Sequence, residues 1–208
     1  MPNSIEAVFG RNITIVYNSI NIKSLNLEEI KKFFSDENPA IIQIPDNVVI
    51  IAFPNKPVFI QIEHERLLVN FNFEENSLGD FPICEYTIKI NKEIIDSGSK
   101  MDSFGFNYDF GIDLHEDANK KLIIQFANFE NNYLKKNKEK LIAFYPTINM
   151  KFNEIEYSYI FNQQDSTKIK VHVKAFFKDI SCFKEENINQ QFIDCYEIAK
   201  TSTMGLLE

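Results

Sequence analysis

A short run in the middle of the chain has the residue types that could bind a divalent metal ion. Between Tyr108 and Asp117, the side chains of Asp109, Asp113 and His115 would point to one side of a β-strand. Asp113 and His115 would lie about 7 Å apart along it, and two carboxylates with an imidazole suit a divalent cation. This pattern predicts a divalent-metal-dependent hydrolase. The alternative is the ordinary polar face of a half-exposed strand that ends in a polar turn.

A second pattern indicates binding and not catalysis. Lys168, Lys170, His172 and Lys174 alternate with β-branched residues, so they would share one face of a strand, with Phe176 available for stacking. Such a face could contact an acidic partner or a nucleic-acid backbone. Alternatively, it is simply exposed to solvent, and its lysines prevent an edge strand from pairing.

The third candidate is the polar tetrad Glu63-His64-Glu65-Arg66, in which a histidine beside carboxylates could act as a general base. A solvated turn between two strands explains the same residues, because neighbours at a hairpin tip point in different directions. No glycine-rich phosphate loop, His-Glu-x-x-His or Gly-x-Ser-x-Gly motif occurs in the sequence. The sequence therefore favours a protein that is not an enzyme, and it predicts no cofactor.

Charge and cysteine content narrow the class of partner. The chain has 22 basic and 30 acidic residues, a net charge of −8, which disfavours non-specific binding to nucleic acid and permits a protein partner. Its three cysteines form no Cys-x-x-Cys motif, as expected of reduced thiols in a cytoplasmic protein. We also expect no secretion signal and no membrane partner, because the apolar runs are short. A homo-oligomer is compatible with the sequence.

These residues must be positioned by helices and strands that the hydrophobic periodicity predicts. Helical spacing indicates a short helix over 27–35, begun by the capping box Asn26-Leu-Glu-Glu29, and a C-terminal amphipathic helix from Asn187. Residues 83–96 fit a helix better than a strand. Alternation on both sides of polar turns predicts two hairpins, 40–44 with 47–53 and 57–63 with 66–73.

The remaining strands give the fold class. Alternation predicts strands at 12–17, 104–114, 122–129, 141–152, 154–161 and 167–177, with a charged loop or single turn at 131–140. We expect an α+β fold of mostly antiparallel sheet. The sequence shows no internal repeat, so one domain over 1–208 is favoured, and a two-lobed division would fall near 96–103.

The hairpin carries a resemblance. Gln61-Ile62 followed by Arg66-Leu67-Leu68-Val69-Asn70 is similar to a stretch of a sporadically distributed bacterial protein family of unknown function. The resemblance implies a hairpin, then an aromatic-led helix at 81–95, a strand at 106–114 and a closing C-terminal helix. It also implies a bacterial source, and it brings no catalytic residues.

Taken together, these patterns predict a bacterial or phage protein that binds another protein through sheet faces rich in aromatic residues. An accessory role in defence, counter-defence or toxin neutralisation would suit such a small acidic protein. The metal-dependent hydrolase is the alternative.

Overall fold

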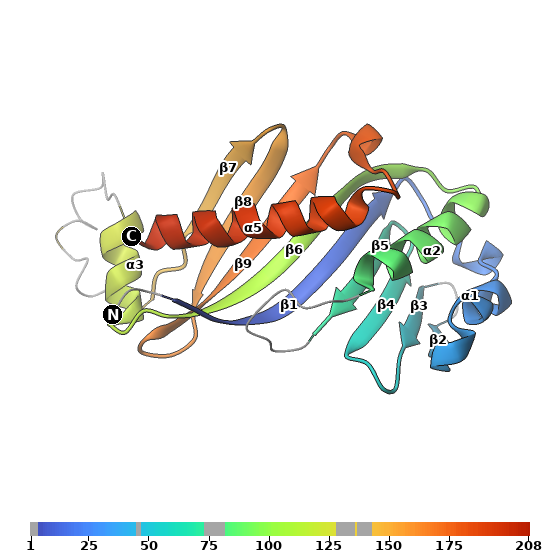
Figure 1. Ribbon diagram of the computed structural model, residues 1–208, viewed down its shortest axis with the longest axis horizontal. Helices are drawn as coiled ribbons and strands as arrows, with labels where there is room; N and C mark the ends of the chain where they lie inside the picture. The colour runs from blue at the N-terminus through green and yellow to red at the C-terminus, as the bar shows by residue number, and fades with distance from the viewer. Residues whose placement is uncertain (1–3, 45–46, 73–81, 128–135, 137–142) are drawn as a thin grey trace.

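The computed structural model describes residues 4–44, 47–72, 82–127, 136 and 143–208, and within them nine strands form one antiparallel sheet. The strand order is β2-β3-β4-β5-β1-β6-β9-β8-β7, and helices lie along one side (Figure 1). The strands are β1 (Ser4–Tyr17), β2 (Ala40–Ile44), β3 (Val48–Ala52), β4 (Val58–Glu63), β5 (Arg66–Phe71), β6 (Met101–Asp113), β7 (Thr147–Phe152), β8 (Ile155–Gln163) and β9 (Lys168–Phe177). The helices are α1 (Leu27–Phe33), α2 (Ile83–Asp96), α3 (Ala118–Phe126) and α5 (Ile188–Leu207).

The two halves of the chain repeat one order of elements, although their sequences show no repeat. In each half a long strand is followed by a helix, then by antiparallel strands, the last of which returns to pair with the first, and then by a longer helix. Thus β5 pairs with β1 in the first half as β9 pairs with β6 in the second. β1 and β6 then join the halves by pairing with each other. The possible division near 96–103 corresponds to this junction, which the sheet crosses without a break.

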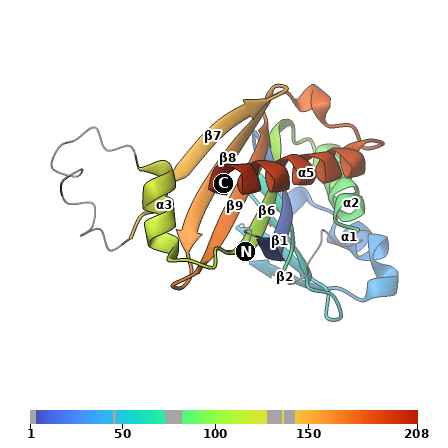
Figure 2. The same ribbon diagram turned by 60° about the vertical axis from the view of Figure 1, so that its left-hand side comes forward.

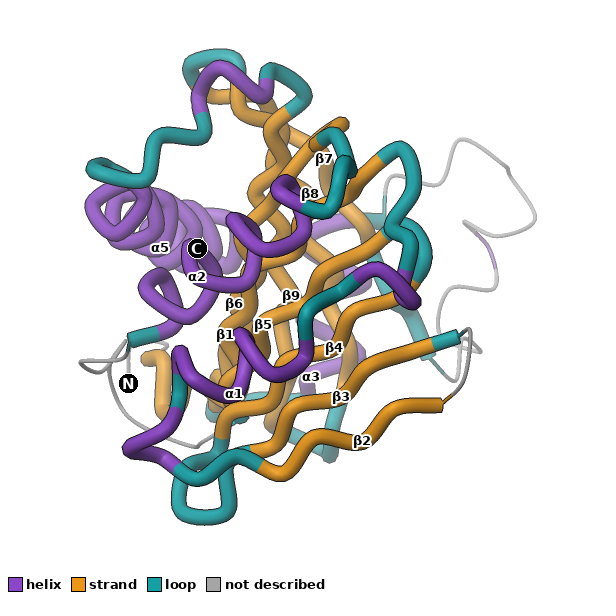
Figure 3. Tube along the Cα trace, turned by 90° about the vertical axis from the view of Figure 1, so that its right-hand side faces the viewer, coloured by secondary structure: helices purple, strands orange, loops and turns teal. Residues whose placement is uncertain are grey.

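The core lies between the sheet and helices α2 and α5. α2 contacts β1 and β5, while α5 crosses β6 and β9 (Figure 2), and both helices lie on the same side of the strand layer (Figure 3). Alternate residues of β6 point toward these helices and are fully buried, from Phe104 to Phe110. The rings of Phe106 and Tyr108 contact Phe192 of α5 at centroid distances of 5.3 and 5.1 Å. Most aromatic side chains of the strands therefore belong to this core.

Local sequence patterns explain most of these elements. The α+β class, both hairpins, the helix at 83–96 and the C-terminal helix are confirmed. Asn26 caps α1, because its side chain accepts a hydrogen bond from the backbone N–H of Glu29 at 3.1 Å. β1 is much longer than the predicted 12–17, because its first part, residues 4–10, pairs with β6.

The strand predicted at 122–129 is wrong, because the structure has helix α3 at Ala118–Phe126. The side chain of Asp117 accepts from the backbone N–H of Lys120 at 2.7 Å and caps the helix. Ala118 and Leu122 are buried, and Phe126 packs on Phe161, so every fourth residue faces the protein. A run as short as this satisfies both periodicities, and the cap decides between them.

Two further predictions fall partly or wholly outside the described residues. The connection at 131–140 lies there apart from residue 136, and of the strand predicted at 141–152 the described part has β7 at Thr147–Phe152. In the part of the chain that the structure describes, no helix is both long and apolar enough to cross a membrane.

Candidate functional site

The residues of β6 and β9 that the sequence singled out lie on the sheet face opposite α2 and α5, on which no described helix lies (Figure 3). We call this the helix-free face. Because strand residues alternate, Asp109, Asp113 and Asn107 point to it while Phe106 and Phe110 point to the core. The same alternation in β9, which pairs with β6, gives the helix-free face these side chains: Lys168, Lys170, His172, Lys174 and Phe176.

One row of side chains crosses this face from β5 to β7, and we call it the polar row. The strand register aligns its members directly across neighbouring strands: Asn70, Asn12, Asn107, Lys174, Ser158 and Asn149. Asn107 donates from Nδ2 to Oδ1 of Asn12 at 2.6 Å. Asn70 and Asn107 are buried, whereas Lys174 and Asn149 are exposed. Asn107 and Asn12 at the centre therefore bond to each other, and the accessible polar groups lie toward β7.

Asp109 is the electrostatic centre of the second half of this face. Its Oδ1 lies 2.8 Å from Nδ1 of His172, and its Oδ2 lies 2.9 Å from Nζ of Lys170. Burial by itself would raise the pKa of Asp109, but the hydrogen bonds with His172 and Lys170 hold it below its ordinary value. The carboxylate lies directly over Gly10, where a Cβ atom would come within 2.9 Å of Oδ2. A larger residue there would require the carboxylate to shift away from this position.

The predicted metal ligands do not form one cluster. β6 ends at Asp113, and His115 follows in a left-handed turn with φ 55°. Asp113 accepts from the backbone N–H of His115 at 2.8 Å, and its Oδ1 also lies 3.5 Å from the His115 Nδ1. Asp109 is instead bound to His172 and Lys170. In the described ranges, no group of three or more histidine, cysteine, aspartate or glutamate side chains could hold a metal ion.

The predicted basic strand exists, but its charges are largely compensated. Lys168 pairs with Glu6 of β1 at 2.9 Å, and Lys170 and His172 share Asp109. The ammonium of Lys174 lies 4.9 Å from the ring centroid of Phe176. The compensating carboxylates come from β1 and β6, which sequence spacing within β9 cannot reveal. This strand consequently offers little unpaired positive charge to a phosphate backbone.

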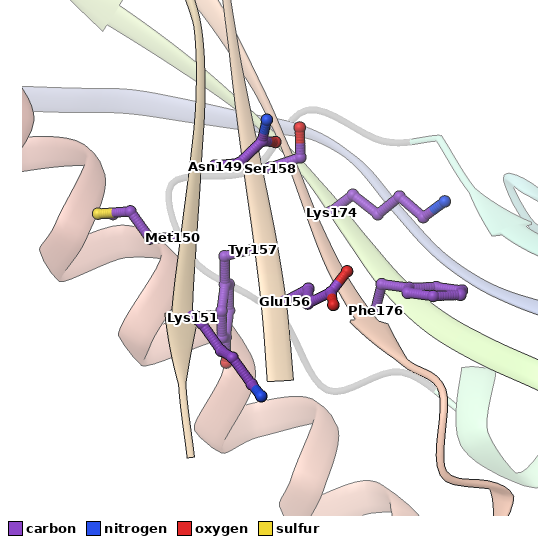
Figure 4. A pocket seen from close by; sticks show the side chains of 8 residues that line it. All are labelled: Asn149, Met150, Lys151, Glu156, Tyr157, Ser158, Lys174 and Phe176. Atoms are coloured by element: carbon purple, nitrogen blue, oxygen red, sulfur yellow. The ribbon is translucent and has the colours of Figure 1, made fainter. Parts of the chain in front are cut away.

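A shallow hollow of about 400 Å³ lies at the exposed end of the polar row, over β7, β8 and β9. Lys174, Phe176 and Glu156 point away from the core around it, while Met150 points toward α5 (Figure 4). Lys178 binds Glu156 at 2.8 Å, and this hydrogen bond lowers the pKa of the Glu156 carboxyl group. The hollow is open and carries both signs of charge, so it fits part of a larger partner better than a small substrate.

An apolar area that the sequence did not indicate lies on the first half of the same face. We call it the apolar patch, and it consists of Ile42, Ile44, Val48, Ile50, Phe59 and Leu68. Ile42 and Ile44 are 54% and 46% exposed. A hollow of about 420 Å³ lies beside it, bordered by Gln61, Glu63 and His64. The alternation in each hairpin predicted two faces, but not that the second face would lack a covering layer.

The two buried cysteines are held in an unreactive state, whereas Cys182 is exposed. Burial raises the pKa of Cys84 to about 12 and of Cys195 to about 11, so both thiols stay protonated at neutral pH. At the 63–66 turn, Arg66 pairs with Glu63 at 2.9 Å, and the hydrogen bond from Arg66 lowers the pKa of Glu63. His64 beside them is exposed at the hairpin tip.

No protein-family model and no curated protein matches this chain.

Proposed function

We propose that this chain is a non-enzymatic binding module, and that it holds another protein against the helix-free face of its sheet. The observation that carries the proposal is the apolar patch, with Ile42 and Ile44 about half exposed on a face where no described helix lies. Contiguous exposed apolar side chains on a soluble domain commonly mark an interaction site.

The charges of the face favour a protein over a nucleic acid. Lys168 and Lys170 of β9 are paired with Glu6 and Asp109, and Lys174 lies over the ring of Phe176. The whole chain has a net charge of −8. Binding to nucleic acid draws most of its affinity from unpaired basic groups near phosphates. A face that combines apolar side chains with compensated ion pairs is closer to the composition of protein–protein interfaces.

The metal-dependent hydrolase has less support, because only Asp113 and His115 contact each other, whereas Asp109 is held by His172 and Lys170. Calorimetric titration with Mn²⁺, Mg²⁺ and Zn²⁺ tests it directly. Saturable binding of one of these ions that Asp113→Ala abolishes would favour the hydrolase. An accessory role in defence, counter-defence or toxin neutralisation stays a prediction.

The experiment for the binding proposal compares two variants with the same chemical change. Ile50→Lys puts a charge in the apolar patch, whereas Ile124→Lys puts one on α3, where Ile124 is 68% exposed. We expect a partner isolated from the native host to bind purified wild-type and Ile124→Lys protein equally, and Ile50→Lys at least about tenfold more weakly. Equal binding by both variants would refute the patch as the contact site.

A second arm identifies the class of partner. Fluorescence anisotropy with single-stranded and double-stranded oligonucleotides should show no salt-dependent binding. Binding that weakens with salt and is lost in Lys174→Ala would replace the protein partner with a nucleic acid.

A further inference from the structure

The free edge of strand β2 differs from the opposite edge of the sheet. β2 is an outermost strand with the sequence Ala-Ile-Ile-Gln-Ile, which has no charged residue, and four of its five residues are exposed. β7, at the other edge, carries Lys151, whose ammonium pairs with Glu154 at 2.6 Å. Charged side chains are a common protection against pairing between exposed edges. β2 lacks this protection.

The edge of β2 has two further properties that favour another strand. Ile42 and Ile44 point to the helix-free face, whereas Ile41 packs against the core from the other side. The strand therefore has apolar side chains on both faces. Among the described residues, its backbone groups pair on one side only, with β3. The prolines at 39 and 45 in the sequence limit this pairing segment to five residues.

We propose that two copies of this chain associate by antiparallel pairing of their β2 strands, which joins the two sheets into one. A pairing centred on Ile42 places Ile42 opposite itself, Ala40 opposite Ile44, and Ile41 opposite Gln43. No charge meets another charge in this arrangement, although each chain carries a net charge of −8. A partner of opposite charge would find nothing to pair with along β2.

The register of the patch supports the same alignment. Ile42 lies directly across from Ile50 of β3, and Ile44 from Val48. Pairing centred on Ile42 brings the two apolar patches into contact on one face of the combined sheet, so each shields part of the other from water. A shift of the pairing by one residue would place residues of the helix-free face in one copy opposite core-facing residues in the other, which disfavours that alignment.

The test uses the purified chain alone, so its result does not depend on the proposed protein partner. Sedimentation velocity over about 5–500 µM should show a shift toward dimer as concentration rises, as expected of a small interface. Ile42→Lys places two ammonium groups opposite each other and should weaken the dimer at least about tenfold. Ile50→Lys, one strand inside the edge, should weaken it much less.

Two outcomes would overturn the proposal. A wild-type chain that stays monomeric over the whole range contradicts it. Equal weakening by Ile42→Lys and Ile50→Lys would also contradict it, because that result indicates face-to-face association of the patches.

Cysteine cross-linking gives a readout that does not depend on affinity. In a Cys182→Ser background, which removes the exposed thiol, Ile42→Cys should form an intermolecular disulfide, because opposed Cβ atoms lie about 5 Å apart. Ile50→Cys should not, since its two copies would be three strand spacings, about 14 Å, apart. Cross-linking of both variants to the same extent would refute the antiparallel register.

Discussion

Asn107 donates a hydrogen bond to Asn12 at 2.6 Å, across the pair of strands at which the two halves of the sheet meet. The same Asn12 oxygen accepts from the hydroxyl of Thr14 at 3.2 Å. If β6 slipped by one residue along β1, the side chain of Asn107 would point into the aromatic core without hydrogen-bond partners. The contact therefore helps to specify how the two halves join.

Loss of this contact should reduce stability. Asn107→Ala removes a buried donor and leaves the Asn12 oxygen with the weaker Thr14 contact, so we expect a loss of about 1–2 kcal/mol in the free energy of unfolding. Asn149→Ala, at the exposed end of the polar row, is the matched control and should change it by less than about 0.5 kcal/mol. Urea denaturation measures both values, and equal losses would contradict a special role for the junction.

Asp109 should make stability depend on acidic pH. Its pKa is lowered in the folded protein despite burial, because of the hydrogen bonds with His172 and Lys170. A carboxyl group with a lowered folded pKa contributes its full stabilisation above its unfolded pKa, about 3.9, and loses it as the pH falls through the folded pKa.

The comparison of wild type with Asp109→Asn isolates this contribution. The wild type should lose more stability than the variant between pH 6 and pH 2, measured as the urea midpoint at each pH. Identical slopes for the two proteins would show that the ion pairs of Asp109 contribute nothing.

Two glycine substitutions should have opposite effects. A Cβ atom at Gly105 would lie 2.8 Å from the backbone oxygen of Ala175, so Gly105→Ala should destabilise the protein by about 1–3 kcal/mol. Gly205 lies inside α5 with nothing within 4 Å of such an atom, so Gly205→Ala should stabilise it by up to about 1 kcal/mol. Thermal unfolding of both variants measures the difference, and a stabilising Gly105→Ala would contradict the close approach of β6 and β9.

The hydroxyl of Tyr108 should anchor α5 to the sheet. It is buried and donates to the backbone oxygen of Phe192 at 2.6 Å. Tyr108→Phe keeps the ring contacts and removes only this bond, so we expect a loss of about 1 kcal/mol in urea unfolding. The rate of backbone hydrogen exchange should also rise in α5 while it stays the same in α2. An unchanged exchange rate in α5 would mean that ring packing alone holds the helix on the sheet.

The sequence determined the elements whose signals are local. The hairpin at 58–71 and the helix Ile188–Leu207 follow from the spacing of apolar residues and from turn chemistry within each segment. The spacing over 83–96 fitted both a helix and a strand and only favoured the helix that the structure has. The alternation in β9 also placed four basic side chains on one face of the strand: Lys168, Lys170, His172 and Lys174. Where the segment was short, as at 118–126, periodicity alone was ambiguous and the strand prediction was wrong.

Only the tertiary structure decided what these faces meet. The partners of His172 and Lys168 are Asp109 and Glu6, which are 63 and 162 residues away in the sequence. Strand order brings them together, and strand order depends on long-range pairing that leaves no local periodic signal. For the same reason the charges of the basic strand are largely compensated, and Asp109 lies apart from Asp113 and His115. The apolar patch on the helix-free face likewise had no sequence signal of its own.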